Sequence, residues 1–224
     1  NKPDHHFAVY ENKNNKIWLD IGFRSRYEKI EQENRLIYWY NYSLSAKLAS
    51  NLYVSSDADL YALLYNGSLS NEPNEFKGGF PLNHHGFYGY EHERSFEYAN
   101  AYFTYKSPYG NFALRKEPLK WGNSNYPLIL SDNTPSFPMI SWDKGIGNNY
   151  FSFFHGSILP ASNDTIINGL IINEDKYLVG HRWEIGLSKN IQISLTEMLV
   201  YGGRDPELVY FLPTIFLWPI QHNM

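Results

Sequence analysis

The chain has 224 residues, of which 43% are hydrophobic, with 19 Tyr, 14 Phe, 6 Trp and no Cys. This length allows a sizeable core in one or two domains, and the missing cysteine excludes disulfides, thiolate metal sites and a cysteine nucleophile. The net charge is −4 and both signs are scattered, so the chain has no basic stripe and we expect no nucleic-acid partner.

The ends of the chain carry little patterning. Residues 1–15 are rich in Asn, Lys and His, and we expect this polar lead-in to be an edge or disordered segment. The opening residues do not resemble a signal peptide, and no stretch approaches the ~18 apolar residues of a transmembrane helix. The chain stops just after an apolar segment, so we expect it to be a mature or truncated piece of something longer.

From Lys16 onward, apolar and polar residues alternate with a period of two. Ile17, Leu19 and Ile21 alternate with Trp18 and Asp20, for example. Such alternation predicts strands with one apolar and one polar face. The expected strands cover roughly residues 16–28, 35–48, 52–65, 96–106, 111–119, 138–142, 149–159, 176–187, 191–201 and 208–217.

The connections between these strands alternate in length. Short ones lie at about 49–51, 107–110, 143–148 and 188–190, and long ones at about 66–95, 120–137 and 160–175, while 29–34 and 202–207 are intermediate. A soluble sandwich has no reason for this alternation, whereas an outer-membrane barrel has tight periplasmic turns and long outer loops.

Strand length and composition indicate the same architecture. Several strands reach the about 9–11 residues that cross a bilayer, and aromatic residues lie near their ends as interfacial girdles require. No backbone group can stay unpaired in lipid, so the sheet must close. We therefore predict an all-β fold, an antiparallel up-and-down transmembrane β-barrel. Residues 16–224 would form about ten strands, the N-terminal part of a larger barrel.

Several blocks in sequence resemble the Wzi-type capsule assembly protein family. They are LRKEPLKWG at 114–122, LILSDNTPSFP at 128–138, FHG at 154–156, YLVGHRWE at 177–184, TEMLVYGGR at 196–204 and YFLP at 210–213. The resemblance spans roughly residues 95–224. Asn123, Ser124 and Asn125 stand where the family usually has Gly-Pro-Gly after the Trp-Gly.

The resemblance implies a bacterial outer-membrane barrel, eighteen-stranded when complete, of which this chain supplies the N-terminal strands. The family is lectin-like and not catalytic. It binds capsular or related exopolysaccharide and attaches it to the cell surface, without a cofactor. The implied partners are the polysaccharide and outer-membrane lipid, with a polysaccharide export machinery as a further candidate.

Charged residues on the polar strand faces are the first candidate binding residues. Arg115 and Glu117 share one face, as do Arg182 and Glu184, and Asp20 with Arg24 and Arg26 is similar. One interpretation is a lumen network in which facing charges pair, because unpaired buried charges are costly. The other is a hydrogen-bonding funnel for acidic sugar chains, and the two are compatible.

Loop residues form the second candidate set. Lys120, Trp121, Ser131 and Asp132 could place an aromatic ring against a sugar face and polar groups against its hydroxyls. Trp121 could instead belong to the interfacial girdle. Arg204, after two glycines, is a similar candidate, with loop capping as its alternative.

Metal binding and catalysis are weaker hypotheses. His84 and His85 precede His92 in the longest loop, but adjacent residues of an extended chain point to opposite faces, so we expect no metal site. Glu184 and Glu197 could be imagined as a glycosidase pair, although sequence sets no distance between them. The rival functions are a porin-like channel and a soluble all-β carbohydrate-active enzyme.

Overall fold

The computed structural model describes residues 6–30, 33–66, 93–122, 129–130, 136–158, 165–167, 170–172 and 175–222. These residues are almost entirely β, which confirms the predicted class. The strands are β1 (Ala8–Glu11), β2 (Asn15–Ile30), β3 (Glu33–Leu48), β4 (Leu52–Tyr65), β5 (Glu93–Ser107), β6 (Gly110–Glu117), β7 (Phe137–Ile146), β8 (Asn149–Ile158), β9 (Thr165–Ile167), β10 (Leu170–Ile172), β11 (Lys176–Ser188) and β12 (Ile191–Gly202). A 3₁₀ turn, η1 (Leu208–Phe211), and a short helix, α1 (Leu217–His222), follow.

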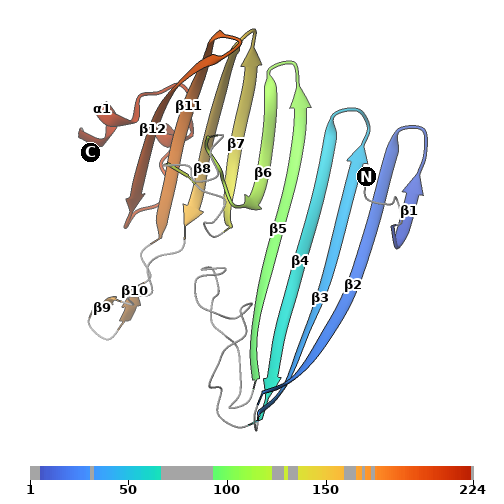
Figure 1. Cartoon of the computed structure of the whole chain (residues 1–224). Helices are drawn as coiled ribbons and strands as arrows, with labels where there is room; N and C mark the ends of the chain where they lie inside the picture. The colour runs from blue at the N-terminus through green and yellow to red at the C-terminus, as the bar shows by residue number, and fades with distance from the viewer. Residues whose placement is uncertain are drawn as a thin grey trace. The chain divides into compact units, whose positions relative to one another are not determined.

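Ten strands form one antiparallel sheet in the order β1-β2-β3-β4-β5-β6-β7-β8-β11-β12 (Figure 1). The strands follow one another in chain order, with the β9–β10 hairpin inserted between β8 and β11, so the predicted up-and-down arrangement is confirmed. Within the residues that the structure describes, β1 and β12 are not paired with each other and the sheet is open. Closure into a barrel stays a prediction.

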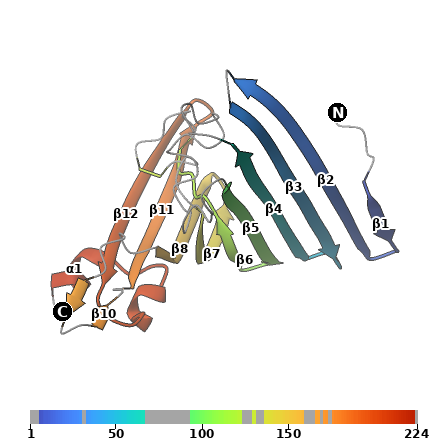
Figure 2. The same ribbon diagram turned by 90° about the horizontal axis from the view of Figure 1, so that it is seen from below.

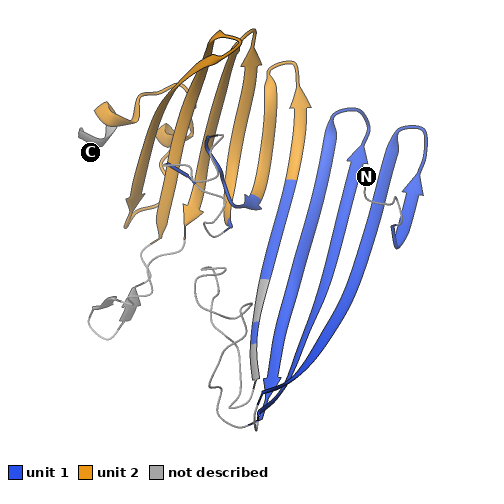
Figure 3. Cartoon of the chain, in the orientation of Figure 1, with its two compact units in different colours: residues 1–102, 116–136 blue, residues 103–115, 137–224 orange. Residues whose placement is uncertain are grey.

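The chain divides into two compact units, coloured separately in Figure 3. Unit 1 comprises residues 1–102 and 116–136, and unit 2 comprises residues 103–115 and 137–224. The boundary falls within β5 and again within β6.

Unit 1 is built on three long strands, β2, β3 and β4, of 16, 16 and 14 residues (Figure 2). Soluble strands are usually ~5–6 residues long. The register places Phe23 opposite Tyr40 and Tyr40 opposite Leu60, and these three side chains are exposed on an apolar face. The intervening residues, among them Arg24 and Trp39, form the opposite, polar face.

One end of this polar face holds a buried ion pair. The guanidinium of Arg35 donates to Oε2 of Glu33 from Nε at 3.2 Å and from Nη2 at 2.6 Å. Arg35 is only 2% exposed, beside an apolar cluster formed by Ile37 and Leu63. The charge is therefore buried together with its partner.

Unit 2 repeats the two-faced design. Across β7, β8, β11 and β12, Trp142 lies opposite Phe153, Phe153 opposite His181, and His181 opposite Glu197. This face is mainly apolar. The alternate residues, such as Arg182 and Glu184 on β11, lie on the polar face.

The prediction of a strand over 208–217 is wrong. These residues form η1 and a loop leading to α1, with Tyr210 and Leu217 buried at 0% and 2% exposure. Pro213 has no N–H to donate to a sheet, so a paired strand here would lose a hydrogen bond. The C-terminal segment, residues 208–222, packs instead on the apolar face of unit 2.

Hydrogen bonds and rings fasten the C-terminal segment. The carboxylate of Glu197 accepts the N–H of Leu217 at 3.1 Å and that of Trp218 at 2.8 Å. Phe211 stacks on His155, with ring centroids 4.1 Å apart. Glu197 thus gives the two backbone N–H groups at the start of α1 a hydrogen-bond acceptor on a face that is otherwise mainly apolar.

Within the predicted lead-in, Ala8–Glu11 forms β1, an edge strand of the sheet that pairs with β2, which agrees with one of the two expected alternatives. Two further differences from the sequence prediction are local. The small β9–β10 hairpin lies in a stretch expected to be a loop. The β2–β3 connection is tight rather than intermediate, since Ile30 pairs with Glu33. No helix in the described part of the chain is long and apolar enough to cross a membrane.

Candidate functional site

The polar face of unit 2 carries a hydrogen-bonded strip of charged and amide side chains. On β11, Arg182 Nη2 donates to Ser194 Oγ of β12 at 2.9 Å, and Gln192 Nε2 of β12 donates to Glu184 Oε2 at 2.7 Å. Arg182 Nε also lies 2.7 Å from Glu184 Oε1, as an ion pair without hydrogen-bond alignment. We call Arg182, Glu184, Gln192 and Ser194 the polar strip.

Other charged groups lie near the polar strip. Tyr150 on β8 pairs with Glu184 in the register, and its hydroxyl interacts electrostatically with Arg115, Asp143 and Glu184. Arg115 therefore lies on the polar side, as the alternation of β6 predicts. Glu117 follows two positions later on the same side of β6, in unit 1. The structure thus brings Arg115, Arg182 and Glu184 to one face.

The polar face of unit 1 carries aromatic rings that the sequence analysis did not select. Trp39 and Tyr61 stack with ring centroids 6.1 Å apart and planes inclined by 18°. The guanidinium carbon of Arg24 lies 5.9 Å from the Trp39 ring centroid. We call Arg24, Trp39 and Tyr61 the aromatic platform. The sequence could have indicated this platform, because Trp39 and Tyr61 occupy positions on the polar faces of strands in which apolar and polar residues alternate.

Polar groups continue along this face. Asn100 Nδ2 donates to Asp57 Oδ2 at 3.2 Å, and Ser136 Oγ donates to Asn100 Oδ1 at 2.8 Å. Asp20 accepts the N–H of Phe7 at 3.1 Å, and its other oxygen lies 2.9 Å from Nδ1 of His6. Arg26 and Glu28 form an ion pair at 2.9 Å. The face therefore combines aromatic rings with polar groups and both charge signs.

The loop candidates are placed differently. Trp121 is only 8% exposed, and its backbone N–H donates to the carbonyl of Leu130 at 3.1 Å, while Lys120 beside it is exposed. Ser131 and Asp132 lie outside the described residues.

Arg204 has the contacts of a loop cap. Its Nη1 lies 2.9 Å from Glu207 Oε1, and its Nη2 donates to the Tyr210 hydroxyl at 3.2 Å. Its guanidinium also lies over the rings of Tyr201 and Tyr210. Arg204 therefore holds the chain between β12 and η1.

The histidines of the described strands are engaged within the fold. His155 Nε2 lies 2.6 Å from the Tyr201 hydroxyl, and His181 Nε2 lies 2.9 Å from Glu197 Oε2. Both pairs lie on the apolar face of unit 2, whereas Glu184 lies on the polar face. Glu184 and Glu197 thus point to opposite sides of the sheet. His84, His85 and His92 lie outside the described residues, among which no group of three or more His, Cys, Asp or Glu side chains could hold a metal ion.

No protein-family model, curated protein or solved structure matches this chain.

Proposed function

We propose that this chain is part of a Wzi-type outer-membrane β-barrel that binds capsular or exopolysaccharide without cleaving it and retains it at the bacterial surface. The sheet closes, on this proposal, with strands supplied by the rest of the barrel. The exposed parts of the apolar faces contact lipid, beside the C-terminal segment that covers part of this face in unit 2, and the polar faces line the lumen. The resemblance in sequence supplies the family, and the chemistry of the two faces supports the role.

The observation that carries the proposal is the contrast between the two faces of strands longer than a bilayer needs. Phe23, Tyr40 and Leu60 are exposed on the apolar face of unit 1, where water would surround them in a soluble protein. Large exposed apolar patches mark membrane or partner surfaces. The opposite face holds the aromatic platform and paired charges, which is the polar lumen expected of such barrels.

The aromatic platform and the polar strip suit a polysaccharide. A sugar ring has apolar C–H faces, and the stacked rings of Trp39 and Tyr61 give such a face a rigid contact. The guanidinium groups of Arg24 and Arg182 can donate two parallel hydrogen bonds to an acidic group. Carboxylates such as Glu184 accept from sugar hydroxyls. Binding then follows from many weak contacts along an extended polymer.

The membrane location is tested on the complete gene product. We expect it in the outer-membrane fraction, with an SDS-gel mobility that changes only after boiling, as for closed barrels whose backbone groups are all paired. Recovery in the soluble fraction without a mobility change would contradict the barrel. A steady open-pore current in planar bilayers would instead favour the porin-like channel.

Polysaccharide binding is tested with two neighbouring residues of β3. Trp39→Ala removes the centre of the aromatic platform, and we expect the retained polysaccharide to fall about 2–10-fold, since an aromatic pair contributes about 0.5–1.5 kcal/mol beyond its burial. Tyr40→Ala is the matched control, because it removes an aromatic ring from the opposite face of the same strand. Equal retention in the two variants, both heat-modifiable, would exclude the platform as the site.

The loop candidates form a second arm of that experiment. Lys120→Ala, Trp121→Ala and Arg204→Ala, introduced separately, weaken retention if the loops share in binding. Unchanged retention in all three would remove them from the site and leave the polar faces of the strands as the binding surface.

A further inference from the structure

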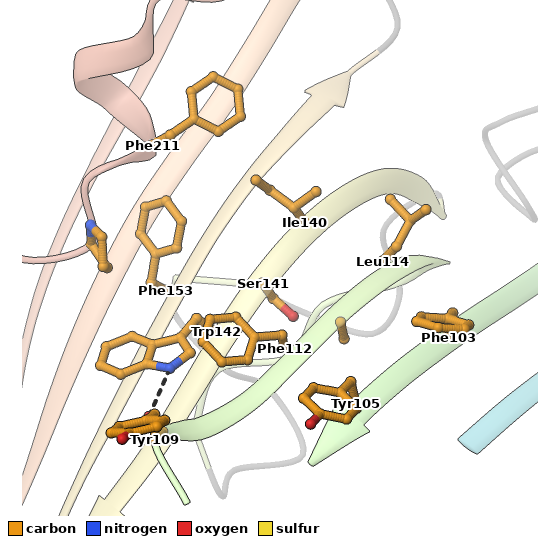
Figure 4. A pocket seen from close by; sticks show the side chains of 12 residues that line it. Phe103, Tyr105, Tyr109, Phe112, Leu114, Ile140, Ser141, Trp142, Phe153 and Phe211 are labelled. Carbon is orange, nitrogen blue, oxygen red and sulfur yellow. Dashed lines mark hydrogen bonds between the residues drawn. The ribbon is translucent and has the colours of Figure 1, made fainter. Parts of the chain in front are cut away.

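An apolar groove of about 630 Å³ lies on the apolar face of unit 2. It is formed by β5, β6, β7 and β8 together with the C-terminal segment, which supplies Phe211 and Pro213 (Figure 4). Its other lining residues are Phe103, Tyr105, Tyr109, Phe112, Ala113, Leu114, Ile140, Ser141, Trp142 and Phe153.

The lining disfavours ligands that need many hydrogen bonds within the groove. Phe103, Phe112, Leu114, Ile140 and Phe153 present only carbon, and the polar side-chain groups of the lining are the hydroxyls of Tyr105, Tyr109 and Ser141 and the indole of Trp142. A sugar or an extended peptide would therefore lose most of its hydrogen bonds to water there, at a cost of several kcal/mol per group. A hydrocarbon chain meets no such cost. The groove therefore suits an aliphatic chain.

One end of the groove has the residues of a membrane interface. At the β5–β6 turn, Trp142 Nε1 donates to the carbonyl of Tyr109 at 3.2 Å, and Figure 4 shows the two rings close together with Phe112. Tyr105 lies at the end of β5, close to the same turn. Trp and Tyr are enriched where hydrocarbon gives way to head groups. An aliphatic chain in the groove would therefore reach its polar head at this turn.

A positive charge lies at the same turn. Lys144 follows Trp142 by two positions on β7, hence on the same face of the sheet, and its ammonium donates to the carbonyl of Pro108. An ammonium has three donors, so this contact positions the group without using all its N–H bonds. A phosphate at the end of the groove would meet a complementary charge.

We propose that the groove binds one acyl chain of a phospholipid whose phosphate is held by Lys144, at the tight-turn end of the barrel. The ligand is thus a membrane phospholipid of the leaflet nearest the tight turns. This inference rests on the proposed membrane location, but it does not depend on polysaccharide binding.

The test uses the complete protein, purified in detergent and mixed with a defined lipid. Native mass spectrometry counts bound phosphatidylglycerol and, separately, bound diacylglycerol with the same acyl chains but no phosphate. We expect one phosphatidylglycerol per protein at concentrations where diacylglycerol does not bind. Lys144→Ala should weaken this binding about 5-fold, the effect of one basic residue at a lipid surface, and Lys144→Arg should restore it.

Two further variants define the site. Lys189→Ala removes an exposed lysine from the β11–β12 turn, at the same end of the sheet but outside the groove, and should leave phosphatidylglycerol binding unchanged. Leu114→Trp narrows the groove and should weaken binding of both lipids. The SDS-gel mobility of each variant before boiling shows whether it has folded.

The outcomes separate this inference from the proposed function. A heat-modifiable protein that binds both lipids equally, or in which Lys144→Ala and Lys189→Ala behave alike, would overturn the phospholipid site and leave the barrel intact. An unaltered protein that binds phosphatidylglycerol but retains no polysaccharide would overturn the proposed function alone. A soluble protein without phosphatidylglycerol binding would overturn both.

Discussion

At the residue scale, Arg35 and Glu33 form a buried ion pair of unit 1 whose loss should be costly. The guanidinium is buried and its carboxylate partner is nearly so, with side-chain exposures of 1% and 12%. Glu33→Gln removes the negative charge that faces the buried guanidinium, and within the described residues Glu33 is the carboxylate that pairs with Arg35. We expect a loss of about 3–5 kcal/mol in the free energy of unfolding, measured as denaturant-induced loss of the heat-modifiable form of the complete protein.

The exposed pair formed by Arg26 and Glu28 is the control for Glu33→Gln. Its Nε and Oε1 atoms lie 2.9 Å apart, but the side chains are 41% and 30% exposed. Glu28→Gln should therefore change stability by about 0–1 kcal/mol. If Glu33→Gln and Glu28→Gln lowered the free energy of unfolding by similar amounts, the burial of Arg35 would not explain the loss of stability.

At the element scale, β8 depends on a glycine that no side chain can replace without movement. A Cβ on Gly156 would lie 2.7 Å from two ring carbons of Phe137 and 3.1 Å from Cβ of Met139. The phenyl ring is rigid and must move as a whole to make room for the added Cβ, so Gly156→Ala should destabilise the sheet by about 1–3 kcal/mol. The measurement is the temperature at which SDS-gel mobility changes.

Gly145 on β7 is the matched glycine. It lies on the same polar face, and its nearest atom to an added Cβ, in the ring of Tyr150, is 3.7 Å away. Gly145→Ala should therefore stay within about 0.5 kcal/mol of the original protein. A transition temperature for Gly156→Ala equal to that for Gly145→Ala would contradict the close packing of β7 against β8.

The elements show what the sequence could and could not predict. Alternation placed the first three long strands within three residues and assigned their faces, because a period of two follows directly from the pleat. It also placed Arg182 and Glu184 together. Which residues of β12 lie beside them depends on the pairing register of β11 with β12. This register shifts between Gly186 and Ser188, so the alternation of the sequence could not predict that Gln192 and Ser194 are their partners.

Two kinds of error have physical causes. The apolar stretch 208–217 looked like a strand because it is hydrophobic, yet Pro213 cannot pair and the apolar face of unit 2 offers Tyr210 and Leu217 a burial site. The aromatic platform was missed because an aromatic ring in sequence looks like core. Alternation puts each ring on a polar strand face, but only the register places Trp39 beside Tyr61.

At the scale of the whole molecule, the proposal assigns opposite solvents to the two sides of the sheet. These 224 residues contain no cysteine, so a single introduced thiol reports one position. In reconstituted vesicles, Asn41→Cys on the polar face should react with a water-soluble maleimide, and Tyr40→Cys on the apolar face should be protected. Equal labelling of both thiols in the folded protein would contradict a lipid-facing apolar surface.

The tight turns at one end of the sheet have a consequence for how such a chain can evolve. A single-residue insertion at Gly147–Asn148 or Lys189–Asn190 would shift a strand by one place and exchange its apolar and polar sides. At the opposite end, between Tyr65 and Glu93, doubling the length of the connection costs only about 0.6 kcal/mol. On the proposed barrel, this long connection can therefore gain or lose residues and supply new outward surface under immune or phage selection. The tight turns, including the β2–β3 turn at the same end as the long connection, keep their residue count.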